Sequence, residues 1–393
     1  MVLPRYLQQS ILADLKQQKM VFIGGPRQVG KTTLAKQVGL DTPIYTYLNW
    51  DNRDDRKKII SYTFQPDSNL IIFDEIHKYR LWKKHIKGLY DKEKEKYNII
   101  VTGSARLDVY RRGGDSLMGR YHYYRLHPFS MREALGIPSS LEVFKPLQFL
   151  DQGIATDELF STLIKFGGFP EPFIAKDETT LRRFHNERLE RLVKEDIRDL
   201  ETIRDLGSLQ VLVEMLPEKV GSLFSLNALR EDLQVAHKTV SLWVDILEKF
   251  YYHFRIYTFA SNTIKSLRKE PKLYLWDWSQ VENPSARLEN MVASHLLKTI
   301  HWLYDSQGFK AELFFLRDRE GREVDFLVTV DKKPWFSVEV KQNNKDVSSH
   351  LKYFGQKLKI PFQYQIVGGM DTEDYIRDGI RVLGAAKFLS GLV

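Results

Sequence analysis

The chain has 393 residues, of which 43% are hydrophobic and 28% charged, with no cysteine and a formal net charge of +8. This composition excludes a disulfide framework and cysteine-based zinc sites, and the length predicts two or three domains with ample hydrophobic cores. The first residues show no signal-peptide pattern and the apolar runs are too short to span a membrane, so we expect a cytoplasmic protein without membrane contact.

The first predicted element is a buried strand over residues 20–23, followed by the run GGPRQVGKTT and by helical sequence over residues 33–38. The spacing GxxxxGKT between a strand and a helix is typical of a phosphate-binding loop, whose backbone N–H groups curl around a polyphosphate. A merely structural glycine turn would leave the Lys-Thr pair at the helix start unexplained. We therefore expect a nucleotide to be bound by Gly25, Pro26, Arg27, Gln28, Val29, Gly30, Lys31, Thr32 and Thr33, with Lys31 on the outer phosphates and the Thr32 hydroxyl on Mg²⁺.

A second apolar run, residues 69–73, ends in the carboxylates Asp74 and Glu75. Continuous apolar sequence of this length predicts a central parallel strand that is buried on both faces. Asp74 at its end is predicted to hold Mg²⁺ through water, and Glu75 to orient and deprotonate the attacking water. The alternative is a buried strand that ends in two solvated acids.

A third strand is predicted over residues 97–102, followed by Gly-Ser-Ala-Arg. A polar side chain at this strand end can contact the γ-phosphate or the water, and Ser104 is our first candidate and Thr102 the second; a serine beside glycine is also ordinary in a turn. Strands and helices alternate from residue 20 to 126, which predicts an α/β layer with a parallel sheet.

These motifs, together with LMGRY (117–121), LHPFS (126–130) and GGFPE (167–171), resemble the prokaryotic AAA-type ATPases fused to a C-terminal nuclease-like domain of unknown function. The resemblance implies binding and hydrolysis of ATP with Mg²⁺. It also implies an arginine, from the same chain or from a neighbouring copy, that stabilises the charge on the transferred phosphoryl group, with Arg106 and Arg120 as candidates. Arg5 and Tyr6 would contact the nucleotide base.

The rest of the chain predicts three further parts. With the AAA-type ATPase domain at 1–140, we expect a helical lid or connector at 141–205, a winged-helix-like module at 206–262 and an α/β nuclease-like domain at 263–393. The winged-helix prediction rests on a short helix over 225–233, with Ser225 as its N-cap, a second helix over 236–250 and a strand after it.

The second of these helices is the part that would face a DNA groove, through Lys238, Thr239, Ser241 and Asp245. Winged helices also serve as protein-binding and lid modules. Asp245 and Glu248 oppose contact with phosphates, so the sequence leaves both readings open.

Near the C-terminus, two alternating strands over 321–328 and 335–341 carry the pattern D-x13-ExK, formed by Asp325, Glu339 and Lys341. The pattern resembles the core of the PD-(D/E)xK nuclease superfamily, in which an upstream helix adds a glutamate, here Glu289. In that chemistry carboxylates hold Mg²⁺, which activates water, and the lysine steadies the developing charge. A hairpin with outward Glu and Lys is common without any such role.

The turn between these strands decides whether the site exists. A two-residue turn at Lys332-Lys333 pairs Asp325 with Val340 and sends Glu339 to the other face, whereas a three-residue turn or a bulge sets Asp325 opposite Glu339. The nuclease-like site therefore requires the longer turn or a bulge.

Two functions fit these predictions. In the first, an AAA-type ATPase moves or gates a nuclease-like domain that acts on DNA; in the second, the same ATPase switches a catalytically inactive nuclease-like domain that binds DNA or a protein. A small-molecule kinase is disfavoured, because the Asp74-Glu75 pair suits the activation of water. Besides ATP, the expected partners are DNA, a protein, and further copies of the chain in a homo-oligomer. The positive net charge permits contact with a polyanion such as DNA.

Overall fold

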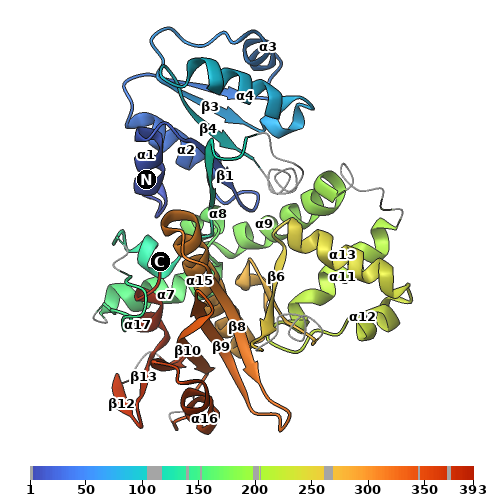
Figure 1. Cartoon of the computed structure of the whole chain (residues 1–393). Helices are drawn as coiled ribbons and strands as arrows, with labels where there is room; N and C mark the ends of the chain where they lie inside the picture. Colours follow the sequence, from blue (N-terminus) through green and yellow to red (C-terminus); the bar gives the residue numbers. More distant parts are fainter. Residues whose placement is uncertain are drawn as a thin grey trace. The chain divides into compact units, whose positions relative to one another are not determined.

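The structure is a computed structural model that describes residues 3–103, 117–138, 141–150, 153–197, 203, 205–260, 269–343, 346–369 and 373–393. The chain divides into two compact units (Figure 1). The first comprises Met1–His127 and Asp305–Gln307, and the second comprises Pro128–Tyr304 and Gly308–Val393.

The first unit is built on a five-stranded sheet in the order β2-β3-β4-β1-β5, in which every neighbouring pair is parallel. All residues of β1 and β3 are buried, as their continuous apolar sequences predict. The predicted parallel α/β sheet is thus confirmed. Its strands are β1 (Met20–Gly24), β2 (Tyr45–Asn49), β3 (Leu70–Asp74), β4 (Asn98–Thr102) and β5 (Tyr121–Arg125).

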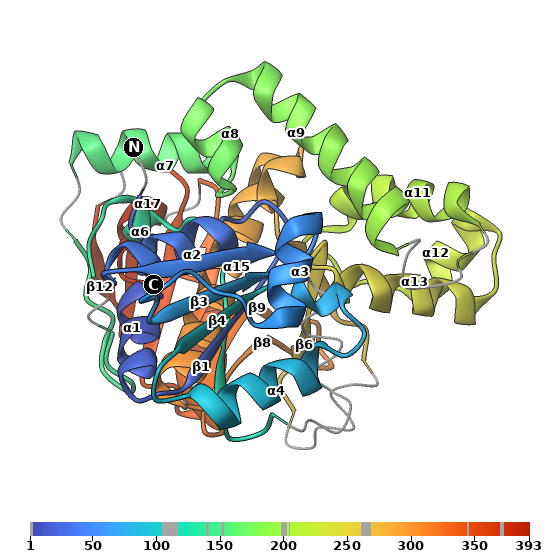
Figure 2. The same cartoon turned by 90° about the horizontal axis from the view of Figure 1, so that it is seen from above.

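Helices pack on this sheet through apolar stripes. Trp82, Ile86 and Leu89 follow one face of α4 at helical spacing and pack in a core with Phe22 and Phe73 of the strands. In Figure 2, α2 and α4 lie on opposite sides of the sheet. The helices are α1 (Gln8–Lys16), α2 (Lys31–Leu40), α3 (Arg53–Ser61), the short η1 (Ile76–Lys78) and α4 (Trp82–Glu93).

The second unit contains a mixed eight-stranded sheet in the order β12-β13-β11-β10-β9-β8-β6-β7. β6 precedes the predicted domain boundary at 262/263 and pairs in parallel with β8, which follows it, so that boundary runs through one sheet. The strands are β6 (His253–Thr258), β7 (Lys272–Leu275), β8 (Ala311–Arg317), β9 (Glu323–Val330), β10 (Lys333–Lys341), β11 (Phe362–Val367), β12 (Tyr375–Arg377) and β13 (Ile380–Gly384).

Helices α12 and α13 of this unit correspond to the two helices that the sequence predicts as parts of a winged helix. They lie beside α11 in both views (Figures 1 and 2). Ser225 stands at the N-cap of α12, but its side chain makes no capping hydrogen bond within the described part of the chain. The helices are α6 (Met131–Ala134), α7 (Ile154–Phe166), α8 (Pro170–Ala175), α9 (Glu178–Arg191), η2 (Leu192–Ile197), α11 (Leu206–Met215), η3 (Leu216–Lys219), α12 (Leu226–Leu233), α13 (His237–Lys249), η4 (Trp278–Gln280), α15 (Pro284–Gln307), α16 (Ser349–Leu358) and α17 (Ala385–Ser390).

Among the helices of the described residues, none combines the length and the apolar character needed to cross a bilayer.

Candidate functional site

The phosphate-binding loop connects the carboxyl end of β1 to α2 and needs glycine at two positions. Gly25 has a φ of 142°, and a Cβ there would lie 2.4 Å from the Leu126 carbonyl oxygen. Gly30 has a φ of 97° and directly precedes the first residue of α2. Both conformations are costly for other residues, so the sequence and the loop geometry agree.

The loop is closed on itself by Lys31. Its Nζ donates to the carbonyl oxygens of Gly25 at 3.1 Å and Pro26 at 2.6 Å. Arg5 holds the loop through Nη1, which donates to the Val29 carbonyl at 2.7 Å, while the Tyr6 hydroxyl donates to the Arg125 carbonyl at 2.6 Å. The roles of Arg5 and Tyr6 toward a nucleotide base stay predictions.

The Asp74 carboxylate is the centre of the site. Thr32 Oγ1 donates to its Oδ2 at 2.9 Å, and Thr102 Oγ1 donates to its Oδ1 at 2.5 Å. β4 lies between β1 and β3, so the ends of three adjacent strands meet here. The structure thus brings together Thr32 and Asp74, the predicted Mg²⁺ ligands, and adds Thr102.

Tyr47 is a contact that the sequence did not reveal. Its hydroxyl donates to Asp74 Oδ2 at 2.8 Å from the neighbouring strand β2. Burial, followed by the hydrogen bond to Asp74, raises the pKa of the Tyr47 hydroxyl above its usual range, so it stays a donor.

Glu75 follows Asp74 at the same edge of the sheet in a left-handed conformation, with a φ of 55°. Its N–H donates to the Thr102 carbonyl at 3.1 Å, which fixes this conformation. Its carboxylate lies 3.3 Å from Lys78 Nζ and 3.6 Å from His77 Nε2. A strained backbone at a carboxylate beside Asp74 is consistent with a functional position.

The predicted arginines and Ser104 have different outcomes. Ser104 and Arg106 lie outside the described residues. The Arg120 carbonyl accepts from Met20 N at the amino end of β1, whereas the phosphate-binding loop leaves the carboxyl end of that strand. Its Nε donates to Asp91 at 2.8 Å. The structure therefore does not bring Arg120 to the loop of its own chain, and a role toward a neighbouring copy stays a prediction.

In the second unit, a bulge in the β9–β10 hairpin sets the register of Asp325 relative to Glu339. The turn residues Asp331 and Lys332 have φ of 48° and 66°, as a two-residue type I′ turn requires. The register then shifts by one residue between Pro334 and Phe336. Val338 stands opposite Phe326, so the next pair along the ladder is Asp325 and Glu339.

Around this pair the structure assembles an ion cluster that includes residues missed in the sequence. Lys272 Nζ lies 2.7 Å from Glu323, 3.2 Å from Asp325 and 3.3 Å from Glu289. Tyr274, two residues further along β7, donates to Glu289 at 2.7 Å. The sequence feature that could have indicated these two residues is their spacing, because residues two apart, such as Lys272 and Tyr274, lie on one face of a strand.

The remaining two predicted residues complete the cluster. Glu339 Oε1 lies 2.6 Å from Lys341 Nζ, and Asp325 Oδ2 accepts a hydrogen bond from the Val340 N–H at 2.9 Å. Glu289, Asp325, Glu339 and Lys341 therefore lie in one cluster together with Glu323 and Lys272; their role as a nuclease-like site stays a prediction.

Burial dominates the electrostatics of this cluster. It raises the pKa of Glu289 and of Glu339 to about 7, with repulsion from Asp325 as the second cause, although the nearby lysines oppose the shift. For Lys272, burial alone lowers the pKa, but the carboxylates of Asp325 and Glu289 outweigh it and hold the pKa above its usual range. Lys272 is thus a permanent cation inside the fold.

The cluster contains the right donors for Mg²⁺, because carboxylate oxygens are its preferred protein ligands. Glu339 also has a buried oxygen, Oε2, without a hydrogen-bond partner among the described residues. However, Glu289, Glu323 and Asp325 converge on the Lys272 ammonium, and the described residues contain no group of three acidic or histidine side chains arranged to hold a metal ion. As folded, the cluster does not fit a divalent cation.

The predicted DNA-facing helix, α13, has its acidic residues paired. Arg255 on β6 donates through Nη2 to Asp245 at 2.8 Å and through Nε to Glu248 at 3.0 Å. Lys238 at its first turn is exposed. A single guanidinium therefore pairs with both acids, and the three side chains together keep a net charge of about −1.

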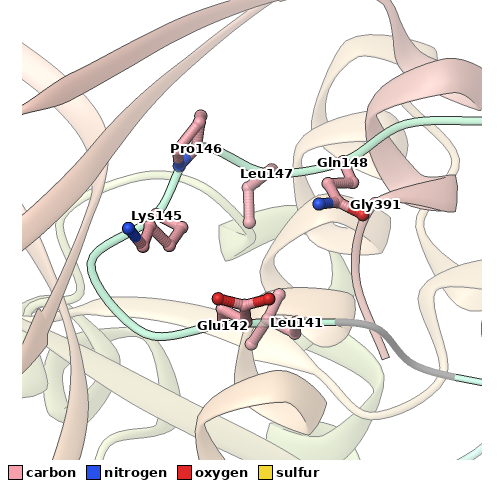
Figure 3. Close-up of a pocket in the computed structure, with 7 residues that line it drawn as sticks. All are labelled: Leu141, Glu142, Lys145, Pro146, Leu147, Gln148 and Gly391. Carbon is pink, nitrogen blue, oxygen red and sulfur yellow. The ribbon is translucent and has the colours of Figure 1, made fainter.

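A small pocket in the second unit contains none of the predicted site residues (Figure 3). It is lined by Leu141, Glu142, Lys145, Pro146, Leu147, Gln148 and Gly391.

Family comparisons divide the chain into three matched segments. Residues 17–135 match the family model described as an AAA domain. Residues 157–282 match a domain of unknown function (DUF8612), and residues 285–388 match another (DUF4143).

Relatives and solved structures are distant. The chain is 23% identical over 387 residues to an uncharacterized protein of Methanocaldococcus jannaschii, covering 90% of this chain and 82% of the relative. It is 23% identical over 338 residues to an uncharacterized protein of Mycobacterium tuberculosis, covering 83% and 70%. A Walker-type ATPase of Pyrococcus abyssi aligns with a TM-score of 0.41 at 12% identity, covering 73% of this chain and 96% of that one. RuvB of Thermotoga maritima aligns with 0.30 at 18% identity, covering 63% and 87%.

The match over residues 17–135 coincides with the part of the chain that carries the phosphate-binding loop and the Asp74 strand. The first unit accordingly contains an AAA-type P-loop ATPase domain.

Proposed function

We propose that the chain hydrolyses ATP with Mg²⁺ in its first unit and that this cycle switches the second unit. The proposal is carried by one observation, the pair of threonine hydroxyls that donate to both oxygens of the buried Asp74 beside the phosphate-binding loop. This arrangement matches the needs of Mg²⁺, which takes few direct protein ligands and keeps several waters.

In this mechanism Lys31 exchanges the carbonyls of Gly25 and Pro26 for the outer phosphates, where its ammonium offsets negative charge. Thr32 and Asp74 would hold the Mg²⁺, which supplies charge neutralisation at the phosphates. Glu75, next to Asp74, orients the attacking water and accepts its proton.

Two substitutions separate binding from turnover. Lys31→Ala is expected to weaken Mg-ATP binding by at least about tenfold, because the phosphates lose their cation, and Glu75→Gln is expected to keep the affinity while kcat falls by about 100-fold or more. Lys16→Ala and Glu95→Gln, at exposed positions of the same unit, are matched controls. ATP affinity unchanged in Lys31→Ala would overturn the assigned loop, and normal hydrolysis in Glu75→Gln would remove Glu75 from the mechanism.

For the second unit we propose a nuclease-like core. The bulged register supports it, because it sets Asp325 opposite Glu339, with Lys341 nearby and Glu289 on α15. Two activities follow from the same core, namely DNA cleavage coupled to ATP hydrolysis, and binding of DNA or a protein without cleavage. The Lys272 ammonium between the carboxylates favours the second.

The α11–α13 group with the β6–β7 ladder supports a winged-helix-like module as the binding element, since α13 offers an exposed Lys238 and its acids are paired with Arg255. The deciding experiment measures nicking of plasmid DNA with Mg²⁺ or Mn²⁺ together with DNA binding by anisotropy. We expect no nicking. Nicking that is lost in Glu339→Ala would establish the cleaving alternative.

A further inference from the structure

Lys272 is held inside the second unit by its backbone as well as by its charge. It belongs to β7, where it stands opposite Ile256 of β6, and it also forms an isolated bridge with Leu223. Its side chain is 3% exposed. The strand therefore fixes the position of the ammonium. Tyr274, two residues further along the strand, holds Glu289 beside it through a hydrogen bond.

The position that the ammonium occupies is the one at which acidic side chains from separate elements converge. Glu289 comes from α15, whereas Glu323 and Asp325 come from β9. All three reach the same Nζ within 3.3 Å. A divalent cation bound by the same carboxylates would lie close to the ammonium and be strongly repelled by it in a buried environment. The metal ion and the ammonium therefore compete for the same position.

A separate observation shows that the cluster holds more ligand capacity than the lysine uses. Glu339 is 4% exposed, and its Oε2 has no hydrogen-bond partner among the described residues. Gly221, with a φ of 76°, allows the chain to pass close to Glu289, since a Cβ there would lie 3.1 Å from Glu289 Oε2. The Glu339 carboxylate thus keeps one buried oxygen that receives no hydrogen bond among the described residues, although Lys341 pairs with its other oxygen.

We propose that Lys272 is a built-in counter-ion that takes the place of a divalent cation, so that the core excludes metal, and that its removal exposes a latent divalent-cation site formed by Glu289, Asp325 and Glu339. The inference deepens the non-cleaving form of the proposed function. It does not depend on ATP hydrolysis, which is measured separately.

The test measures Mn²⁺ binding by the full chain without nucleotide. Binding is monitored by the shift in Tm on thermal unfolding and by Mn²⁺ electron paramagnetic resonance. For the unsubstituted protein we expect no Mn²⁺-dependent shift in Tm. Lys272→Met, which keeps the apolar stem, is expected to have a lower Tm that rises by about 3 °C or more at a tenfold excess of Mn²⁺ over Kd. Adding Asp325→Asn to this variant is expected to abolish the rise.

Lys341→Met is the matched control, because it removes a lysine from the same cluster but leaves the Lys272 ammonium in place; it is expected to gain no Mn²⁺ site. If Lys272→Met does not fold, Lys272→Gln is used in its place. The absence of Mn²⁺ binding by the unsubstituted protein is tested in either case. Mn²⁺ binding by the unsubstituted protein that Asp325→Asn abolishes would overturn the proposal, and so would a folded Lys272→Met that binds no Mn²⁺.

Discussion

At the scale of single residues, the nucleotide site depends on how a buried carboxylate is satisfied. Asp74 is 6% exposed and receives hydroxyl donors from Thr32, Thr102 and Tyr47. The three donors come from α2, β4 and β2 respectively. A buried carboxylate without such donors would be costly, so these hydroxyls stabilise Asp74 and hold its side chain in place.

Thr102→Val tests this arrangement, because it keeps the shape of the side chain and removes only the hydroxyl. We expect the free energy of unfolding of the first unit to fall by about 1–3 kcal/mol, since a hydrogen bond to a charged group is lost in the interior. Urea unfolding measures the change. Thr102→Ser, which retains the hydroxyl, is expected to stay closer to the unsubstituted protein, and equal losses in both variants would contradict the role of the hydroxyl.

These residues also show what the sequence predicts at this scale. The phosphate-binding loop and Asp74 are contiguous motifs with fixed local geometry, so their positions follow from the sequence. Lys272 and Asp325 are 53 positions apart, and Tyr47 and Asp74 are 27 apart, without any shared motif. Such contacts arise from strand neighbours in a sheet, which a single sequence does not specify.

At the scale of elements, the β9–β10 hairpin shows how one extra residue sets the chemistry of a face. Without the bulge after Pro334, the two-residue turn would place Asp325 opposite Val338 and Glu339 opposite the fully buried Val324. Trp335 is the extra residue of the bulge. It is buried, and its Nε1 donates to the Lys145 carbonyl at 2.9 Å. The sequence predicts that a bulge or longer turn is needed; where it lies depends on this tertiary contact.

Helix α15 provides a second element-scale constraint, the neutral form of His295. Its Nε2 accepts from the Met131 N–H at 3.0 Å, so Nδ1 carries the proton and donates to the Met291 carbonyl at 2.8 Å. Burial lowers the pKa of His295 to about 3, with Lys298 on the same helix adding to the shift and Glu133 of α6 opposing it. Protonation would break the bond to α6.

His295 should therefore make a pH-dependent contribution to the stability of the second unit. The folded pKa of His295 is depressed below its unfolded value near 6.5, so its contribution is complete above pH 6.5 and is lost as the pH falls toward 3. One such group lowers the free energy of unfolding by up to about 1.4 kcal/mol per pH unit in that window. Urea unfolding at pH 8, 6 and 5 measures the slope.

The comparison variant is His295→Gln, which cannot titrate in this range. Its slope between pH 6 and 5 should be shallower than that of the unsubstituted protein. His253, whose pKa burial lowers to about 4, adds to the slope in both proteins, whereas Glu289 and Glu339, whose pKa values are raised to about 7, oppose it in both. These contributions cancel in the difference. Equal slopes in the two proteins would show that His295 is not neutral in the fold.

At the scale of the whole molecule, each unit has an apolar core of its own. The first is centred on Phe22, Phe73 and Trp82, and the second includes a cluster around Leu327, Leu351 and Phe354. A compact unit with its own core is expected to unfold cooperatively by itself. A nucleotide bound to the first unit should therefore stabilise that unit more than the second.

Calorimetry of the full chain is expected to show two transitions, of which Mg-ATP raises that of the first unit more than that of the second. At 100 times Kd the ligand adds about 2.7 kcal/mol to the stability of the unit that binds it, which moves its Tm by several degrees. Lys31→Ala identifies the transition, because its response to Mg-ATP should be lost while both transitions remain. If Mg-ATP instead moves both transitions by the same amount, the two units unfold as one, which would contradict independent unfolding of two cores.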